Sequence, residues 1–141
     1  MKLAVLRAYA LQLEQAAKLE LAEVAQALNE TDVRLAALDR QADLGADRYV
    51  AQVQGGTTVG DLYARLDEME TMIAEKRAAE QARASLQERW ISKRDEVLDA
   101  SRYRKKLDIL YERGIREQRR RSEQADQRLI DDRTWRRTGV S

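Results

Sequence analysis

The amino-acid sequence predicts an all-α protein, a long two-helix antiparallel coiled-coil hairpin with a C-terminal helical overhang. Three observations lead to this fold class. The 141-residue chain has 36% charged residues, only 5% aromatic residues and no Pro, a composition typical of long helices. Apolar residues recur at alternating steps of three and four, which is the spacing of a coiled-coil seam. A single glycine-containing break interrupts a sequence that otherwise favours helix throughout.

This break lies at residues 54–60, which hold three of the six glycines. Paired glycines end a helix readily because Gly adopts positive φ at little cost. Thr58, followed three residues later by Asp61, fits an acidic form of the capping box that begins the next helix. We therefore predict one coiled-coil hairpin over residues 1–141, with helix one at about 2–53, the turn at 54–60 and helix two at about 61–137.

The predicted seam follows ranks of residues spaced seven apart. In helix one, the first rank consists of Leu3, Ala10, Ala17, Val24, Thr31 and Leu38, and the second of Leu21, Leu28, Leu35, Ala42 and Tyr49. Leu6 and Leu13 begin a third rank, so the sequence suggests a stutter near Leu21. In helix two, the predicted seam comprises Leu62, Leu66, Met69, Ile73, Ala79, Leu86, Trp90, Val97, Ala100, Leu107 and Leu110 or Tyr111.

A short connection makes two long helices antiparallel neighbours, so Leu3 should lie near Tyr111. Helix two should then continue for about 40 Å without a partner, at 1.5 Å per residue. This overhang contains an arginine-rich stretch, but acidic residues are interspersed with it and the net charge of the chain is only +1. Nucleic-acid binding usually needs a clear basic excess, so no nucleic-acid partner is expected. A protein-docking surface and a solvated helix with i,i+4 ion pairs both fit the pattern.

The residue types needed for most catalysis are missing. The chain has no His and no Cys, which removes the usual general base, the thiolate nucleophile and most transition-metal sites. Residues 55–60 lack the Gly-Lys-Ser/Thr ending of a phosphate-binding loop. We predict a protein that is not an enzyme and has no cofactor. No apolar run approaches the roughly 20 residues of a membrane span, so a soluble cytoplasmic protein is expected.

Three segments and the layout of the chain point to a family. The segments are Leu62–Met69, which opens helix two, the basic and leucine-containing stretch Ser101–Leu110, and Leu129–Asp132 after the arginine-rich region. With the shorter first helix and the glycine turn, they resemble the FliJ family of flagellar export proteins. The chain is more distantly similar to the YscO-type stalk proteins of type III injectisomes. These residues leave both systems open.

The resemblance implies a non-enzymatic stalk and adaptor that inserts into the hexameric export ATPase, promotes its assembly and activity, and links it to the export-gate membrane protein. Export chaperones are also implied as partners, and the location is the cytoplasm at the inner face of the cell membrane. The residues expected to face the ATPase are Arg113, Arg116, Arg119, Arg120, Arg121, Arg128, Asp131 and Asp132. Those expected to face the gate are Tyr49, Leu62, Leu66, Met69 and Ile73.

Two other functions fit the same residues. The heptads would serve equally well in a generic coiled-coil scaffold or an export chaperone without ATPase coupling, and they allow pairing between chains as well as within one. A nucleic-acid-binding helix would instead show binding to any polyanion that falls steeply with salt.

Overall fold

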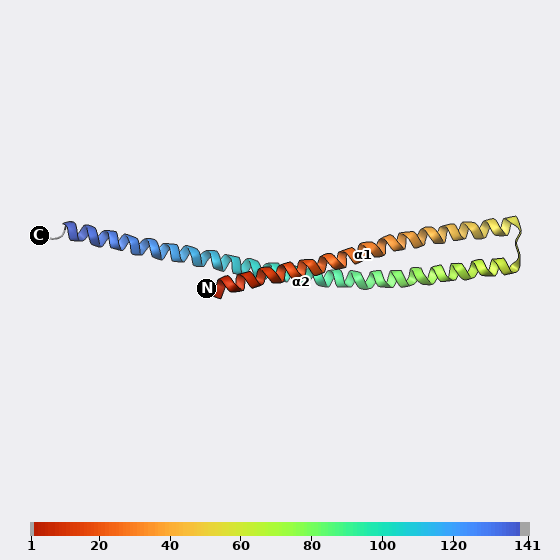
Figure 1. Ribbon diagram of the computed structural model, residues 1–141, viewed down its shortest axis with the longest axis horizontal. Coiled ribbons are helices and arrows are strands. Elements are labelled where there is room, and N and C mark those ends of the chain that lie inside the picture. Colours follow the sequence, from red (N-terminus) through yellow and green to blue (C-terminus); the bar gives the residue numbers. More distant parts are fainter. Residues whose placement is uncertain (1, 139–141) are drawn as a thin grey trace. The chain divides into compact units, whose positions relative to one another are not determined.

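The computed structural model describes residues 2–138. It contains two helices, α1 at Lys2–Gly55 and α2 at Val59–Thr138, and these described residues form no strand (Figure 1). The two long helices pack against each other, which confirms the predicted all-α fold class. The connection consists of residues 56–58 and lies inside the stretch 54–60 where the turn was predicted.

The connection has the residues that its geometry requires. Gly56 follows the last residue of α1 with φ +76°, a left-handed conformation that side chains with a Cβ adopt at a cost of about 1–2 kcal/mol. At the start of α2, the hydroxyl of Thr58 accepts a hydrogen bond from the N–H of Asp61 at 3.2 Å. Thr58 therefore caps α2 as its sequence position predicted, and the carboxylate of Asp61 lies in the first turn, where the helix dipole favours it.

Contacts divide the chain into two units. Ala17–Val97 forms the turn unit, which contains the second part of α1, the connection and the first part of α2. Met1–Ala16 and Leu98–Ser141 form the terminal unit, which contains the first turns of α1 and the rest of α2. Each unit is described by itself below.

In the turn unit, the two helical segments run antiparallel (Figure 1). A narrow seam lies between them, and its buried residues are Val24, Leu38, Gly45 and Ala79. Half-buried residues fill the other positions at alternating steps of three and four: Leu21, Leu28, Thr31, Leu35, Ala42 and Tyr49 on α1, and Leu62, Met69, Met72, Leu86 and Trp90 on α2. This register is unbroken on α1, so the stutter predicted near Leu21 is absent.

Near the turn, the predicted seam of α2 is wrong at two positions. Leu66 and Ile73 are 40% and 49% exposed, and Arg65 and Met72 lie at the seam in their place. Counted back from Trp90 in alternating steps of three and four, the seam reaches Met72 and Arg65. Each lies one residue before the predicted Ile73 and Leu66. Met72 packs over Gly45, where an added Cβ would lie 3.7 Å from the sulfur. The Nε of Arg65 donates to the Gln52 side chain at 3.1 Å, so its stem fills the seam while its charge reaches a polar partner.

Ion pairs cross the turn unit at intervals, each with its cation on α2 and its carboxylate on α1. They are Lys76–Asp39 at 2.7 Å, Arg83–Asp32 at 2.5 Å and Lys93–Glu20 at 2.9 Å. The carboxylates hold the pKa of each lysine above its usual value, through their hydrogen bonds first. Because these groups are largely solvated, each pair contributes little stability. Together they instead disfavour a slipped register, which would break all three pairs at once.

In the terminal unit, Ala10 and Leu107 are buried, and Tyr111 is the half-buried seam residue above them. Leu110, the alternative prediction, is 49% exposed, and the predicted third rank, Leu6 and Leu13, is 44% and 41% exposed. Past the first residues of α1, α2 continues alone (Figure 1). Every residue from 118 to 137 is exposed. Residues 116–137 are called the overhang below.

Candidate functional site

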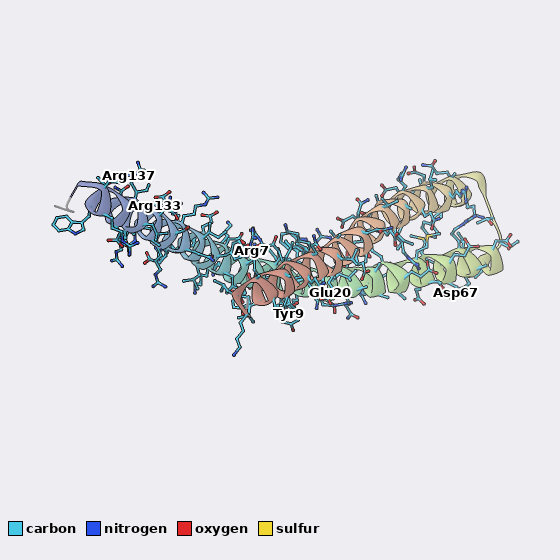
Figure 2. The ribbon with its side chains drawn as sticks, turned by 60° about the vertical axis from the view of Figure 1, so that its left-hand side comes forward. Arg7, Tyr9, Glu20, Asp67, Arg133 and Arg137 are labelled. Carbon is cyan, nitrogen blue, oxygen red and sulfur yellow. The ribbon has the colours of Figure 1, made fainter. Side chains whose placement is uncertain are left out.

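The residues predicted to face an ATPase lie on or beside the overhang. Arg116, Arg119, Arg120, Arg121, Arg128, Asp131 and Asp132 belong to it, and Arg113 lies one turn earlier. All eight side chains are exposed. Figure 2 shows Arg133 and Arg137 further along the same unaccompanied helix. The structure therefore places this predicted set along one stretch of α2, at and beyond the point where α1 ends.

These arginines divide into those with an ion pair and those without. In the first group, Arg120 and Arg121 both bind Glu117, three and four residues away on the same helix, with contacts of 2.6 and 3.3 Å, and Arg116 lies 4.0 Å from Glu112. Arg113, Arg119 and Arg128 make no hydrogen bond or ion pair with any residue between 2 and 138. The second group has its full hydrogen-bonding capacity available for another molecule.

Glu117 is the anion that organises the first group. The hydrogen bond from Arg120 lowers the pKa of the Glu117 carboxyl, and the charges of Arg120 and Arg121 act in the same direction. The carboxylate therefore stays ionised in the folded chain below its ordinary pKa of 4.5. Such i,i+3 and i,i+4 pairs stabilise an isolated helix by about 0.2–0.5 kcal/mol each, and they help the overhang to remain helical.

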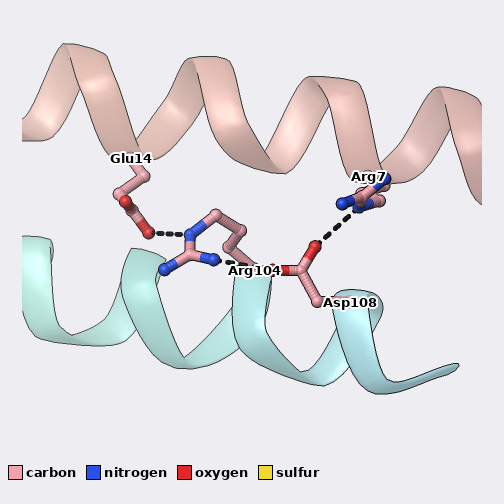
Figure 3. Close-up of polar contacts among 4 residues, drawn as sticks. All are labelled: Arg7, Glu14, Arg104 and Asp108. Carbon is pink, nitrogen blue, oxygen red and sulfur yellow. Dashed lines mark hydrogen bonds and ion pairs between the residues drawn. The ribbon is translucent and has the colours of Figure 1, made fainter. Parts of the chain in front are cut away.

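A network of four charged side chains joins α1 to α2 in the terminal unit (Figure 3). The Nε of Arg104 donates to Glu14 at 2.5 Å, and its Nη1 donates to Asp108 at 2.6 Å. The Nε of Arg7 donates to the other carboxylate oxygen of Asp108 at 2.7 Å. The Arg7 guanidinium also lies 4.7 Å from the centre of the Tyr111 ring, within the range of a cation–π contact.

This network fixes the register of α1 against α2, and so the residue of α2 beside which α1 begins. Glu14 is buried, with 3% of its surface exposed, and its carboxylate accepts a hydrogen bond from Arg104. A slip of one heptad would leave Glu14 without that partner, which is costly for a buried carboxylate. The hydrogen bond from Arg7 lowers the pKa of Asp108, so this carboxylate is ionised near neutral pH and can hold both arginines. The length of the overhang is thus defined by specific side chains.

The sequence analysis missed this network, although a signal was present. Glu14 lies seven residues before Leu21 in the second rank of α1, and Arg104 lies seven after Val97 in the seam of α2. When two helices are predicted to pair, an acidic residue at a seam position of one and a basic residue at a seam position of the other can form such a contact. The predicted seam was built from apolar residues, so neither Glu14 nor Arg104 was part of it.

The residues predicted to face an export gate do not form one surface. Tyr49, Leu62 and Met69 are half-buried in the seam of the turn unit, whereas Leu66 and Ile73 point away from it. Two residues outside the predicted set accompany the exposed pair. Val59 and Tyr63 are 66% and 65% exposed on neighbouring turns of α2. We call Val59, Tyr63, Leu66 and Ile73 the turn-end stripe.

Two kinds of site are absent from the described part of the chain. Neither helix holds a segment both long and apolar enough to cross a membrane. Residues 2–138 also contain no group of three or more His, Cys, Asp or Glu side chains arranged to hold a metal ion.

Comparison with known proteins identifies the family. The model of the flagellar FliJ protein family matches residues 1–139, nearly the whole chain. No curated protein and no solved structure gave a match. The match selects the flagellar system of the two that the sequence left open and agrees with the helical fold. The chain therefore belongs to the FliJ family and is a component of the flagellar protein-export apparatus.

Proposed function

We propose that this protein is a non-enzymatic stalk of the flagellar export apparatus, whose overhang inserts into the hexameric export ATPase and promotes its assembly and activity. On this proposal the protein works in the cytoplasm at the inner face of the cell membrane. The turn-end stripe contacts the membrane protein of the export gate, and export chaperones are further partners. No cofactor and no nucleic acid takes part.

One observation carries the proposal: within residues 2–138, a long helical segment has no partner helix and bears arginines that make no hydrogen bond or ion pair. An isolated helix in water is marginally stable, so a docked state would account for a segment of this length. The surface of the overhang mixes both signs of charge. This surface offers few apolar contacts. It would therefore suit a central pore that binds a stalk loosely.

The test replaces the three arginines that have no intramolecular partner. Arg113, Arg119 and Arg128 are changed together to Gln, which removes charge and keeps a good helix former. The matched control changes Arg34, Arg77 and Arg89 to Gln, three exposed arginines on the paired helices that likewise make no ion pair within residues 2–138. Purified protein is added to the export ATPase, and hydrolysis and hexamer formation are measured. We expect the overhang variant to lose most of the stimulation and the control to keep it.

The gate contact rests on the turn-end stripe. Leu66 and Ile73 are exposed apolar residues on the same face of α2, spaced by one heptad, and Tyr63 lies beside them. Exposed apolar residues grouped in this way mark interaction sites more often than scattered ones do. The half-buried members of the predicted set, Tyr49, Leu62 and Met69, act by holding the two helices together behind the stripe.

A binding measurement separates these two roles. The variant Leu66→Ser with Ile73→Ser should weaken binding to the cytoplasmic part of the gate protein by about tenfold or more, since exposed anchors often account for 1–2 kcal/mol each. Leu19→Ser with Val33→Ser is the control, because these side chains are 63% and 61% exposed elsewhere on the turn unit. Equal losses for both variants would remove the stripe from the proposal.

A scaffold or export chaperone without ATPase coupling is the alternative outcome. It predicts that ATP hydrolysis and ring assembly are unchanged by the protein, while clients or other chains still bind the exposed apolar residues.

A further inference from the structure

An uncharged face begins at the half-buried Ile115, one residue before the overhang, and continues along the overhang. Its residues are Ile115, Gln118, Ser122, Ala125 and Leu129. They alternate at steps of three and four, so they share one side of the helix. More than half of the residues around them are charged. Tyr111 is the preceding seam residue and is still covered by α1, whereas residues 118–137 are all exposed.

The charges of this segment separate on the two sides of Ser122. Between residues 113 and 121, the chain has Arg113, Arg116, Arg119, Arg120 and Arg121 against Glu117 alone. Between residues 123 and 132, it has Glu123, Asp126, Asp131 and Asp132 against Arg128 alone, and Arg133, Arg136 and Arg137 follow. Residues 113–121 are therefore the basic half of the segment, and residues 123–132 are its acidic half. Such a segment is complementary to a reversed copy of itself.

We propose that two copies of this chain pair through their overhangs, antiparallel and centred on Ser122. In this arrangement the basic half of each copy lies along the acidic half of the other. Ile115 lies seven residues before Ser122 and Leu129 seven after it, so each Ile115 meets the other copy's Leu129. A parallel pair in register would place arginines against arginines and carboxylates against carboxylates, which costs free energy at every turn.

Arg119 and Asp126 provide the specific contact. They lie just beside the uncharged face, on the same flank, at nearly equal distances from Ser122. In an antiparallel pair, residues on the same flank of the two helices face each other, so Arg119 of each copy meets Asp126 of the other. Neither side chain makes a hydrogen bond or ion pair within the described chain. On the other flank, Arg121 is held by Glu117 of its own helix at 3.3 Å.

Thiol cross-linking tests the pairing. The chain has no Cys, so Ser122→Cys introduces a unique thiol at the centre of symmetry, where it meets its own copy. The control is Gln124→Cys, which lies about 200° further round the helix and faces away. Under mild oxidation of the full chain, we expect Ser122→Cys to form the disulfide dimer at least about tenfold faster, because pairing raises the effective thiol concentration. Equal rates for the two variants would overturn the proposal.

Charge reversal tests the direction of pairing. In the Ser122→Cys background, Arg119→Glu or Asp126→Arg alone should reduce cross-linking to the rate of the Gln124→Cys control, since each variant opposes like charges twice. Mixing the two variants should restore the fast rate, because the mixed pair carries two matched contacts. Sedimentation velocity without oxidant should show the same order of association. If each single reversal leaves the rate high, or if the mixture stays slow, the antiparallel arrangement is wrong.

The self-pairing does not depend on the proposed ATPase role, since these assays contain no ATPase. It identifies a state in which the overhang is occupied before any ring is present, and a ring would have to displace the second copy. If the protein does not pair with itself but still stimulates the ATPase, the self-pairing is rejected and the proposed ATPase role stands.

Discussion

The paired part of α2 and its overhang contain similar residue types but use them differently. In the turn unit, Lys76, Arg83 and Lys93 each reach a carboxylate on α1. In the overhang, Arg120 and Arg121 turn back to Glu117 of their own helix, and Arg119 has no partner within the described residues. A basic residue on a long helix thus maintains register where a second helix faces it, and becomes available for other molecules where none does.

The same contrast applies to apolar residues. Leu107 is 6% exposed in the terminal unit, where α1 covers it, whereas Leu129 on the overhang is 59% exposed. Burial supplies most of the stability of a helix this long, because intrinsic helix propensity alone leaves it marginal. The paired stretches should therefore respond to side-chain truncation and the overhang should not.

The largest expected effect comes from truncating a buried leucine of the paired stretch, compared with an exposed leucine of the overhang. Leu107→Ala should lower the free energy of unfolding by about 2–3 kcal/mol, at the lower end of the range for leucine truncation because a narrow seam can relax. Leu129→Ala should change it by less than about 0.5 kcal/mol, as for most exposed sites. Urea denaturation followed by circular dichroism measures both, at low protein concentration so that any self-association is negligible. A large loss from Leu129→Ala would show that the overhang is packed in the isolated chain.

The next effect concerns the buried carboxylate. Glu14→Ala should lower Tm because it leaves Arg104 without its main partner at the seam, whereas Glu14→Leu combined with Arg104→Leu should recover most of the loss. A thermal double-mutant cycle measures the coupling of the two side chains. If the two single losses simply add in the double variant, the network does not act as a unit.

A smaller effect compares two glycines of the turn unit. Gly56→Ala should destabilise the hairpin by about 1–2 kcal/mol, since Gly56 has φ +76°. Gly45→Ala should stabilise it by about 0.5–1 kcal/mol, because Gly45 is within α1 and the new Cβ would meet Met72 at an ordinary contact distance of 3.7 Å. Chemical denaturation of both variants checks the two signs. A loss from Gly45→Ala would mean that the helices are closer at Met72 than described.

The smallest effect is a difference in acid stability. Asp108 has a folded pKa below its ordinary 3.8 because Arg7 and Arg104 donate to it. Its contribution is therefore fully present above about pH 3.8 and is lost as pH falls through the lower folded value. We expect the Tm difference between the wild type and Asp108→Asn to shrink as pH falls from 6 to 2. The corresponding change at Glu117 should alter helix content at the overhang and leave Tm unchanged.

The sequence predicted the seam correctly wherever apolar residues mark it without competition. Val24, Leu38, Ala79 and Leu107 were all assigned to it and are all buried. The prediction failed near the turn because Leu66 and Ile73 are as apolar as the residues beside them. The choice of Arg65 and Met72 depends on the opposite helix, where Gln52 and Gly45 receive them. Local spacing cannot supply that information.

The candidate site shows the same limit. The overhang followed from helix lengths and from the loss of bulky residues after Ile115, which are properties of the sequence itself. Which of its arginines lack an intramolecular partner depends on rotamers and on the position of Glu117, so the sequence could not separate Arg119 from Arg120. Prediction of the charged network around Arg104 would have required the exact register of the two helices, because its members on α1 and α2 are far apart in the sequence.

The central claim is that the protein couples to the export ATPase, and one measurement tests it most directly. Purified protein is added to the export ATPase from the same organism, and ATP hydrolysis is followed together with ring assembly by mass photometry. Faster hydrolysis and hexamers that carry one copy of this chain are the predicted result. An unchanged rate and unchanged assembly, with an ATPase shown to be active, would contradict the account and leave a coiled-coil scaffold within the export apparatus.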